Sequence, residues 1–233
     1  MPSPLTYLFF LVLGLARGLA AQSPGAELYR DDFSGDLSQW VVEQQPGGTV
    51  RIRDGALEID DAAGCTVWFR TKLTAPVVIT YEVTFVTAGG PNDRLSDLNC
   101  FWMASDPRSP ADLFAAGHGR NGLFATYDPL RTYYVGQGGN TNTTTRFRRY
   151  DGTGARPLLP GHERTGAEDL LTAGATYQIR LEARPDGTVR YSANGRLLFE
   201  WVDPQPLKEG WFGFRTVRSH QRIRNFQIVQ SGP

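Results

Sequence analysis

The sequence is poor in residues that commonly build metal and catalytic centres. It has two cysteines, two methionines and three histidines among 233 residues. His118, His162 and His220 lie far apart and no Cys/His ligand spacing occurs, so neither a metal site nor a cofactor is expected. Net charge is also absent, because 24 basic residues balance 24 acidic ones. A general nucleic-acid or membrane-surface binder is therefore not expected.

Long apolar runs are missing after the first residues. The run from Leu5 to Ala16 is followed by Gly18 and Ala20, which have the spacing of a cleavage site for signal peptidase. We therefore predict a signal peptide over residues 1–20 and a secreted or periplasmic protein that has no membrane association after cleavage. Cleavage after Ala21 and retention of the run as a membrane anchor are the alternatives.

Export gives the two cysteines a possible structural role. In an oxidising compartment Cys65 and Cys100 could form a disulfide, closing a loop of about 35 residues and contributing roughly 3–4 kcal/mol in the chain-entropy model. Each cysteine also lies in an apolar stretch, "GCTVWF" and "NCFWM". Two separate buried thiols are therefore the alternative.

Turn residues are frequent and helical periodicity is weak. The 26 glycines and 15 prolines, with hairpin signals such as Asn194-Gly195, separate short runs of alternating or β-branched residues. This pattern predicts an all-β antiparallel sandwich or barrel in a single domain over residues 26–233. The predicted strands are Glu27–Phe33, Thr49–Arg53, Ala56–Asp60, Thr66–Leu73, Val77–Thr87, Asn99–Ala104, Arg131–Gln137, Thr143–Tyr150, Thr176–Ala183, Val189–Ala193, Arg196–Val202, Gly210–Arg215 and Ile223–Val229.

One stretch, "YYVGQGGNTNTTTRFRRY" (Tyr133–Tyr150), is rich in Tyr, Arg, Asn and Thr and has no acidic residue. Long connections flank it, Asp106–Leu130 and Asp151–Gly174, which we predict to be lids or binding walls. Strand alternation would place arginines, tyrosines and amides on one surface, and these groups suit sugars. The predicted ligand-binding residues are Gln137, Asn140, Asn142, Arg146, Arg148, Tyr150 and, as a possible stacking platform, Trp102.

Charge is unevenly distributed around this stretch. Residues 118–164 contain seven arginines and three acidic residues, a local excess of four positive charges. Because guanidinium groups bind carboxylates in a bidentate manner, we predict an acidic polysaccharide or oligosaccharide as the partner. The alternative is a solvated outer face whose arginines pair with nearby acids. The oligomeric state is not predicted.

Two segments resemble a known superfamily. "LYRDDFSGDLSQW" with "VRIRDGALEID", and "YQIRLEARPDGTVRYSANGRLLFEW" with "GWFGFRTVRSHQRIRNFQI", are similar to the concanavalin A-like lectin/glucanase jelly rolls. The middle segments, "NCFWMASDP" and "RTYYVGQGGNTNTTTRFRRYDG", resemble uncharacterised bacterial exported proteins of the YesU-like type, which are associated with pectin-type polysaccharides. The resemblance implies two stacked antiparallel sheets with a glycan groove on the concave face.

The superfamily also contains alginate lyases, and the resemblance to them implies candidate catalytic residues for β-elimination. In those lyases an Arg or an amide neutralises the uronate carboxylate, a His is the base and a Tyr transfers the proton. The resemblance implies Arg131, Gln137 and Asn140 for neutralisation, His118 as base and Tyr133 or Tyr134 for proton transfer. The lysine of the lyases' tyrosine strand motif is missing here. His162 is the alternative base. A glycoside hydrolase using Glu163, Glu168 and Asp169, and a non-catalytic glycan-binding module, remain alternatives.

Overall fold

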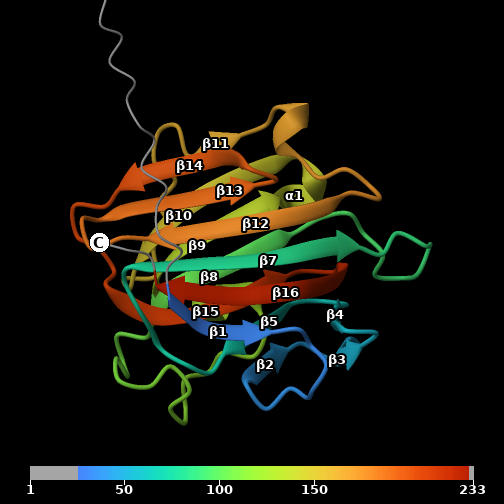
Figure 1. The fold of residues 1–233 in the computed structure, drawn as a ribbon, viewed down its shortest axis with the longest axis horizontal. Coiled ribbons are helices and arrows are strands. Elements are labelled where there is room, and N and C mark those ends of the chain that lie inside the picture. Colours follow the sequence, from blue (N-terminus) through green and yellow to red (C-terminus); the bar gives the residue numbers. More distant parts are fainter. Residues whose placement is uncertain (1–25, 231–233) are drawn as a thin grey trace, which may run out of the picture.

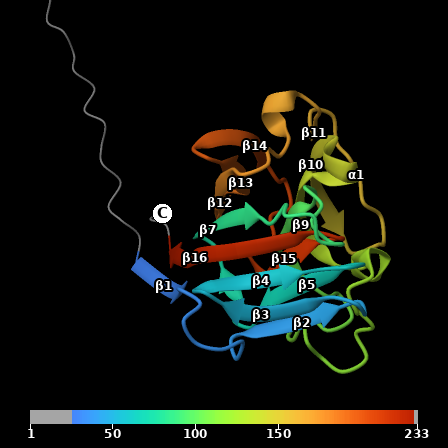
Figure 2. The same ribbon diagram turned by 90° about the vertical axis from the view of Figure 1, so that its right-hand side faces the viewer.

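The computed structural model describes residues 26–230, which form two antiparallel β-sheets stacked face to face (Figures 1 and 2). The prediction of an all-β sandwich of two antiparallel sheets is therefore confirmed. The predicted signal peptide, residues 1–20, lies outside the described residues. Within residues 26–230, no helix has the length and apolar character needed to cross a bilayer.

The β7 sheet has eight strands and lies in front in Figure 1. Its strands, in spatial order, are β14 (Arg196–Val202), β13 (Thr188–Ala193), β12 (Thr176–Ala183), β7 (Val77–Phe85), β16 (His220–Gln230), β4 (Ala56–Asp60) and β3 (Thr49–Arg53), with β1 (Ala26–Asp31) also paired to β16.

The β9 sheet, the rear layer in Figure 1, also has eight strands. They are, in order, β11 (Glu163–Arg164), β10 (Thr144–Asp151), β9 (Arg131–Gly138), β8 (Leu98–Ser105), β15 (Glu209–Thr216), β5 (Cys65–Phe69) and β2 (Trp40–Gln44), with β6 (Leu73–Thr74) also paired to β15. Three short helical segments complete the fold: η1 (Phe124–Tyr127), α1 (Gly139–Asn142) and η2 (Ala167–Asp169).

The main core fills the space between the sheets. Alternate residues of β7, such as Ile79 and Val83, are buried, while Thr80 and Glu82 between them are partly exposed. The β9 sheet contributes its own alternate residues to the same cluster, among them Val135. Because each strand buries one face, its alternating pattern fixes which side chains remain available on the outside.

A second apolar cluster covers part of the outer face of the β9 sheet, the face turned away from the β7 sheet. Trp68 of β5 and Phe101 of β8 stack at 5.5 Å, and Tyr127 of η1 stacks on Phe101 at 5.5 Å. Leu113 and Leu130 of the β8–β9 connection are fully buried in this cluster. The connection thus seals the outer face over β5, β8 and β15.

The two cysteines do not form the predicted disulfide. Cys65 and Cys100 are free and buried, so the alternative of two separate thiols describes the structure. Cys65 lies opposite Thr216 on one side of β15, and Cys100 lies opposite Phe214 on its other side. The two cysteines are therefore separated by two strand spacings, or about 10 Å. A disulfide bridges Cα atoms that are at most roughly 7 Å apart.

Candidate functional site

The register of β9 and β10 decides which side chains share a surface. Arg146 lies opposite Gly136, and Arg148 lies opposite Tyr134. Opposed residues of an antiparallel pair point to the same side of the sheet. Phe147, between the two arginines, is buried in the core between the sheets. Arg146, Arg148 and Tyr134 therefore project together from the outer face of the β9 sheet.

Tyr133 and Gln137 point the opposite way, between the sheets. Tyr133 is fully buried and its hydroxyl donates to Asp203 Oδ2 at 2.8 Å. Gln137 accepts at Oε1 a hydrogen bond of 2.8 Å from the Tyr191 hydroxyl of β13. The expectation that they share a surface with the two arginines is wrong, because the even-numbered residues of β9 oppose the even-numbered residues of β10.

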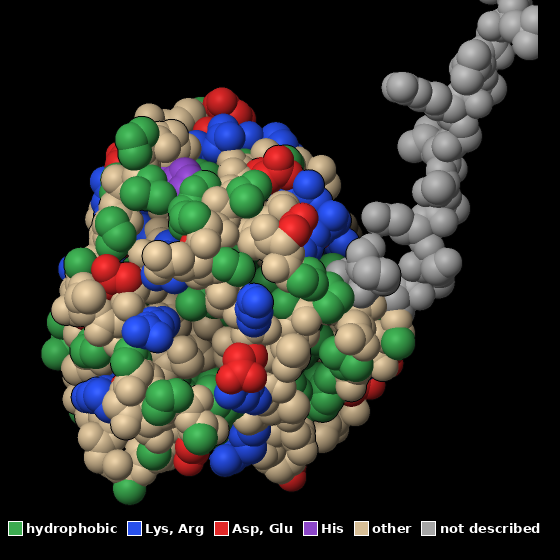
Figure 3. All heavy atoms as spheres, turned by 90° about the vertical axis from the view of Figure 1, so that its left-hand side faces the viewer, with side chains coloured by type: hydrophobic (Ala, Val, Ile, Leu, Met, Phe, Trp, Pro, Cys, Tyr) green, Lys and Arg blue, Asp and Glu red, His purple; other side chains and the backbone are tan. Residues whose placement is uncertain are grey.

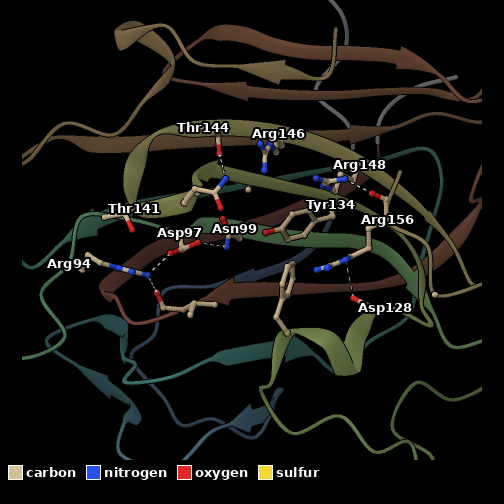
Figure 4. A pocket seen from close by; sticks show the side chains of 16 residues that line it. Arg94, Asp97, Asn99, Asp128, Tyr134, Thr141, Thr144, Arg146, Arg148 and Arg156 are labelled. Carbon is tan, nitrogen blue, oxygen red and sulfur yellow. Dashed lines mark hydrogen bonds and ion pairs between the residues drawn. The ribbon is translucent and has the colours of Figure 1, made fainter. Parts of the chain in front are cut away.

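An open pocket of about 810 Å³ lies over this outer face (Figure 4). Strands β8, β9 and β10 supply its floor, and the segments that connect strands supply its walls. The lining residues are Arg94, Asp97, Asn99, Phe124, Asp128, Tyr134, Gly136, Gly139, Asn140, Thr141, Thr144, Arg146, Arg148, Gly154, Arg156 and Val217.

Three connections form most of the walls, and Val217 of the β15–β16 connection adds to them. The β8–β9 connection contributes Phe124 and Asp128, and the β10–β11 connection contributes Arg156. Both of these long segments were expected to lie at a binding site, and both border this pocket. A further wall, which the sequence did not indicate, is the β7–β8 connection with Arg94 and Asp97.

The turn between β9 and β10 forms one end of the pocket in an unusual backbone conformation. Asn140, Thr141 and Asn142 have φ values of 52°, 61° and 58°, a region that threonine seldom adopts. The Asn142 side chain holds the turn by donating to the Leu171 carbonyl at 2.9 Å and accepting from the Leu171 amide at 2.8 Å. Asn142 thus braces the turn, whereas Asn140 and Thr141 line the pocket.

The pocket carries net positive charge, since four arginines and two aspartates line it. Three of these arginines have carboxylate partners, which limits what they can offer a ligand. The ion pairs are Arg94–Asp97 at 2.9 Å, Arg156–Asp128 at 3.4 Å and Arg146–Glu163 at 3.0 Å.

Arg148 is the exception. No carboxylate of residues 26–230 forms an ion pair with it, and its guanidinium donates to the backbone carbonyl of Arg156. Burial, together with the neighbouring charges of Arg146 and Arg156, lowers the pKa of Arg148 below its ordinary value. A guanidinium nevertheless stays protonated at neutral pH. Arg148 is thus a half-buried cation whose charge is not balanced directly by any carboxylate of the described residues.

Tyr134 lies beside Arg148 on the floor. Its ring packs against Phe101 at 5.1 Å and against Phe124 at 5.5 Å. Burial raises the pKa of Tyr134 well above its usual value, so its phenol remains neutral and can donate a hydrogen bond. Asp128 on the adjacent wall also has a raised pKa, because burial outweighs the charge of Arg156.

His118 does not reach the pocket. Its Nδ1 accepts a hydrogen bond of 3.0 Å from the Arg120 amide, and its Nε2 lies 3.8 Å from Glu43 Oε1. Arg120 joins Glu43 to Asp106 in a buried ion network. His118 therefore borders a structural network under the β8–β9 connection. The expected grouping of this histidine with Tyr134 and Arg146 in one cleft does not occur.

Three further candidates also lie outside the pocket lining. Arg131 is exposed at the start of β9 and donates to the Asp151 carbonyl at 3.3 Å. Tyr150 is fully buried beneath Tyr134, with the ring centroids 5.8 Å apart. Trp102 is 1% exposed in the core between the sheets, so it cannot act as a stacking platform.

Asn99 is a pocket residue that was not predicted as a site residue from the sequence. It lies on β8 opposite Gly136, is 5% exposed and lines the floor. Its signal in the sequence is a polar amide within an otherwise apolar strand, "LNCFWMA". Burying a polar side chain lowers the stability of the fold unless the side chain has a hydrogen-bond partner. A polar residue in a buried strand therefore indicates a specific structural or functional role.

The face of the molecule in Figure 3 carries side chains of both charges. There, Lys and Arg side chains alternate with Asp and Glu and with small apolar areas. Among residues 26–230, no group of three His, Cys, Asp or Glu side chains is arranged to hold a metal ion.

Solved structures share this fold. A Bacillus subtilis protein of unknown function with a galectin-like fold is 21% identical with a TM-score of 0.70, over 90% of this chain and 98% of that one. The carbohydrate-binding module CBM66 from Bacillus subtilis is 12% identical with a TM-score of 0.55, over 82% and 96%. A β-1,3-1,4-glucanase (lichenase) from a mouse hindgut metagenome is 13% identical with a TM-score of 0.55, over 88% and 99%.

These similarities establish the fold as a galectin-like, concanavalin A-like jelly roll. Among curated proteins, none matches the chain. One family model does match, over residues 59–226, which include every strand of the pocket floor. The chain therefore belongs to the family described as "Domain of unknown function (DUF6250)".

Proposed function

We propose that the protein is exported and binds an acidic polysaccharide in the pocket on the outer face of the β9 sheet. The observation that carries this proposal is Arg148, a half-buried guanidinium without a carboxylate partner among the described residues, beside the Tyr134 phenol. A buried charge is unfavourable unless it is paired. A ligand carboxylate would supply the missing partner in a geometry that guanidinium groups favour.

The surroundings of Arg148 suit a saccharide more than a bare anion. Asn99, Asn140, Thr141 and Thr144 offer amide and hydroxyl groups along the same pocket, and sugar hydroxyls need such directional partners. A volume of about 810 Å³ falls in the usual range for small-molecule sites. Structures of similar fold include a carbohydrate-binding module and a glucanase, and the resemblance to YesU-like exported proteins favours a pectin-type glycan.

Catalysis by β-elimination is a second candidate. Elimination requires a cation for the uronate carboxylate, a base for the adjacent proton and an acid for the leaving oxygen. Arg148 and the protonated Tyr134 suit the first and third roles, and Asp128, a lining carboxylate with a raised pKa, is the candidate base. Hydrolysis is less supported, since Glu163, Glu168 and Asp169 do not line the pocket.

One set of measurements separates these outcomes. Purified protein is incubated with polygalacturonate, alginate, glucuronan and neutral β-glucan, and binding is measured by affinity electrophoresis. We expect retention on one of the acidic polymers and none on the neutral one. New ultraviolet absorbance would indicate elimination, and new reducing ends without absorbance would indicate hydrolysis. Equal retention on neutral and acidic polymers would contradict an acidic ligand.

A further inference from the structure

A row of residues crosses the outer face of the β9 sheet and has a gap in its middle. Arg146 on β10 lies opposite Gly136 on β9, which in turn lies opposite Asn99 on β8. Side chains in such a row normally contact one another, because opposed Cβ atoms are about 5 Å apart. Gly136 has no side chain, and the Tyr134 phenol borders the space that a side chain would take between Arg146 and Asn99.

The Asn99 amide presents an unused acceptor at this gap. Its Nδ2 donates to Asp97 Oδ1 at 3.2 Å. This contact fixes the orientation of the amide, since the reverse would bring two oxygens together. Oδ1 is buried and has no hydrogen-bond partner within residues 26–230. Buried acceptors are nearly always satisfied in folded proteins, so Oδ1 is suited to a donor that arrives with a ligand.

The Tyr134 hydroxyl borders the same gap. A methyl group placed on Gly136 would lie 2.8 Å from the Tyr134 hydroxyl and 3.1 Å from Asn99 Oδ1. The two polar atoms therefore both lie close to the Gly136 backbone, at the floor of the pocket. Figure 4 shows Asn99 and Tyr134 side by side on the floor, with Arg146 and Arg148 along one side.

We propose that Gly136, Asn99 and Tyr134 form a subsite for a hydroxyl group of the ligand, next to the arginines that take its carboxylate. This inference rests on the proposed function and adds to it a chemical requirement: the ligand is a sugar acid with a free hydroxyl near its carboxylate. Asn99 Oδ1 accepts a hydrogen bond from the ligand hydroxyl, the Tyr134 phenol donates one to the hydroxyl oxygen, and the missing side chain of Gly136 lets the hydroxyl approach both.

The test compares two ligands that share a six-membered ring and a carboxylate. Galacturonate carries hydroxyls and cyclohexanecarboxylate carries none, and their dissociation constants are measured by ligand-observed NMR. The native protein should bind galacturonate at least tenfold more tightly than cyclohexanecarboxylate. In Asn99→Ala this preference should fall by about tenfold, with the affinity for cyclohexanecarboxylate unchanged. Equal preference in the native protein and Asn99→Ala would overturn the subsite.

Gly136→Ala gives a second test with a matched control. The added methyl group fills the gap and should weaken galacturonate binding at least tenfold. Gly35→Ala changes a glycine of the β1–β2 connection, outside the pocket lining, where a methyl group meets nothing within 4 Å, so binding should be retained. If Gly136→Ala, shown to be folded by circular dichroism, binds like the native protein, the subsite is refuted. If the native protein binds no sugar acid, the proposed function itself fails.

Discussion

Replacing Arg148 by glutamine should separate binding from stability. The side chain lies on the pocket floor, has no carboxylate partner in the described part of the chain and neighbours Arg146 and Arg156. Arg148→Gln removes the charge and keeps much of the side-chain volume. We expect weaker binding of an acidic oligosaccharide, together with unchanged or slightly higher stability of the fold.

The magnitudes follow from the contacts. A hydrogen bond to a charged group contributes about 1.5–3 kcal/mol, which corresponds to roughly a tenfold to 150-fold loss of affinity. Removing one of several adjacent like charges relieves repulsion on the order of 0.5 kcal/mol. The hydrogen bond to the Arg156 carbonyl is lost at the same time, which offsets much of that gain. The free energy of unfolding should therefore change by less than about 1 kcal/mol.

The neighbouring Arg149 is the matched control. It points to the other side of β10 and donates to Asp203 Oδ2 at 3.1 Å, and Asp203 is 3% exposed. Arg149→Gln should lower the free energy of unfolding by about 1–3 kcal/mol, because it weakens the pairing of a buried carboxylate, and should leave binding intact. Binding is measured by calorimetry and stability by urea titration. Native affinity in Arg148→Gln, or loss of binding in both variants, would refute the assignment of Arg148.

Three further predictions concern the fold. Burial lowers the pKa of His162 below its ordinary 6.5, so the unfolded chain binds more protons below that pH. Stability should therefore be fully present above about pH 7 and decrease as the pH falls, and less steeply in His162→Phe, as measured by urea titrations between pH 5 and 8. Cys65 and Cys100 should both react with a thiol reagent in urea but not in the native state, whereas a single disulfide-linked species by mass spectrometry would contradict the structure. Gly213→Ala places a methyl group 2.6 Å from the Trp68 ring and should lower the free energy of unfolding by about 1–3 kcal/mol; an unchanged melting temperature would be inconsistent with this contact.

The sheet strands could be predicted from local sequence because alternation and turn residues are local properties. The bounds of β3, β4, β12 and β14 agree with the predicted strands. β2 (Trp40–Gln44) was missed because its five residues, WVVEQ, do not alternate between apolar and polar or between buried and exposed. The predicted strand Thr66–Leu73 corresponds to two strands, β5 and β6, which end and begin on either side of a turn.

The candidate site was predicted only in part because its composition depends on register. Alternation along β10 correctly separated Arg146 and Arg148 from Phe147. Whether Tyr133 or Tyr134 accompanies them depends on how β9 pairs with β10, and a shift of one residue exchanges the two faces. The sequence of either strand alone does not contain that information.

The count of arginines and acidic residues over residues 118–164 overestimated the positive charge that is available to a ligand, for a similar reason. Most arginines of residues 118–164 have partners, and several of those partners are distant in sequence, as for Arg149 with Asp203 and Arg120 with Glu43. The alternative of ordinary pairing thus describes most of this set. Arg131 and Arg148 have no ion-pair partner among the described residues, and of the two only Arg148 lines the pocket.

The β8–β9 connection covers part of the outer face of the β9 sheet and so limits the length of polymer that can contact the pocket. Leu113, Tyr127 and Leu130 occupy the outer face over β5, β8 and β15, so the open footprint is centred on β9 and β10. Neighbouring strands are about 4.8 Å apart, which leaves a platform of roughly 10 Å across the strand direction. A long polymer would touch this platform through a brief segment only, and tight retention would then require several copies of the protein to act on one chain.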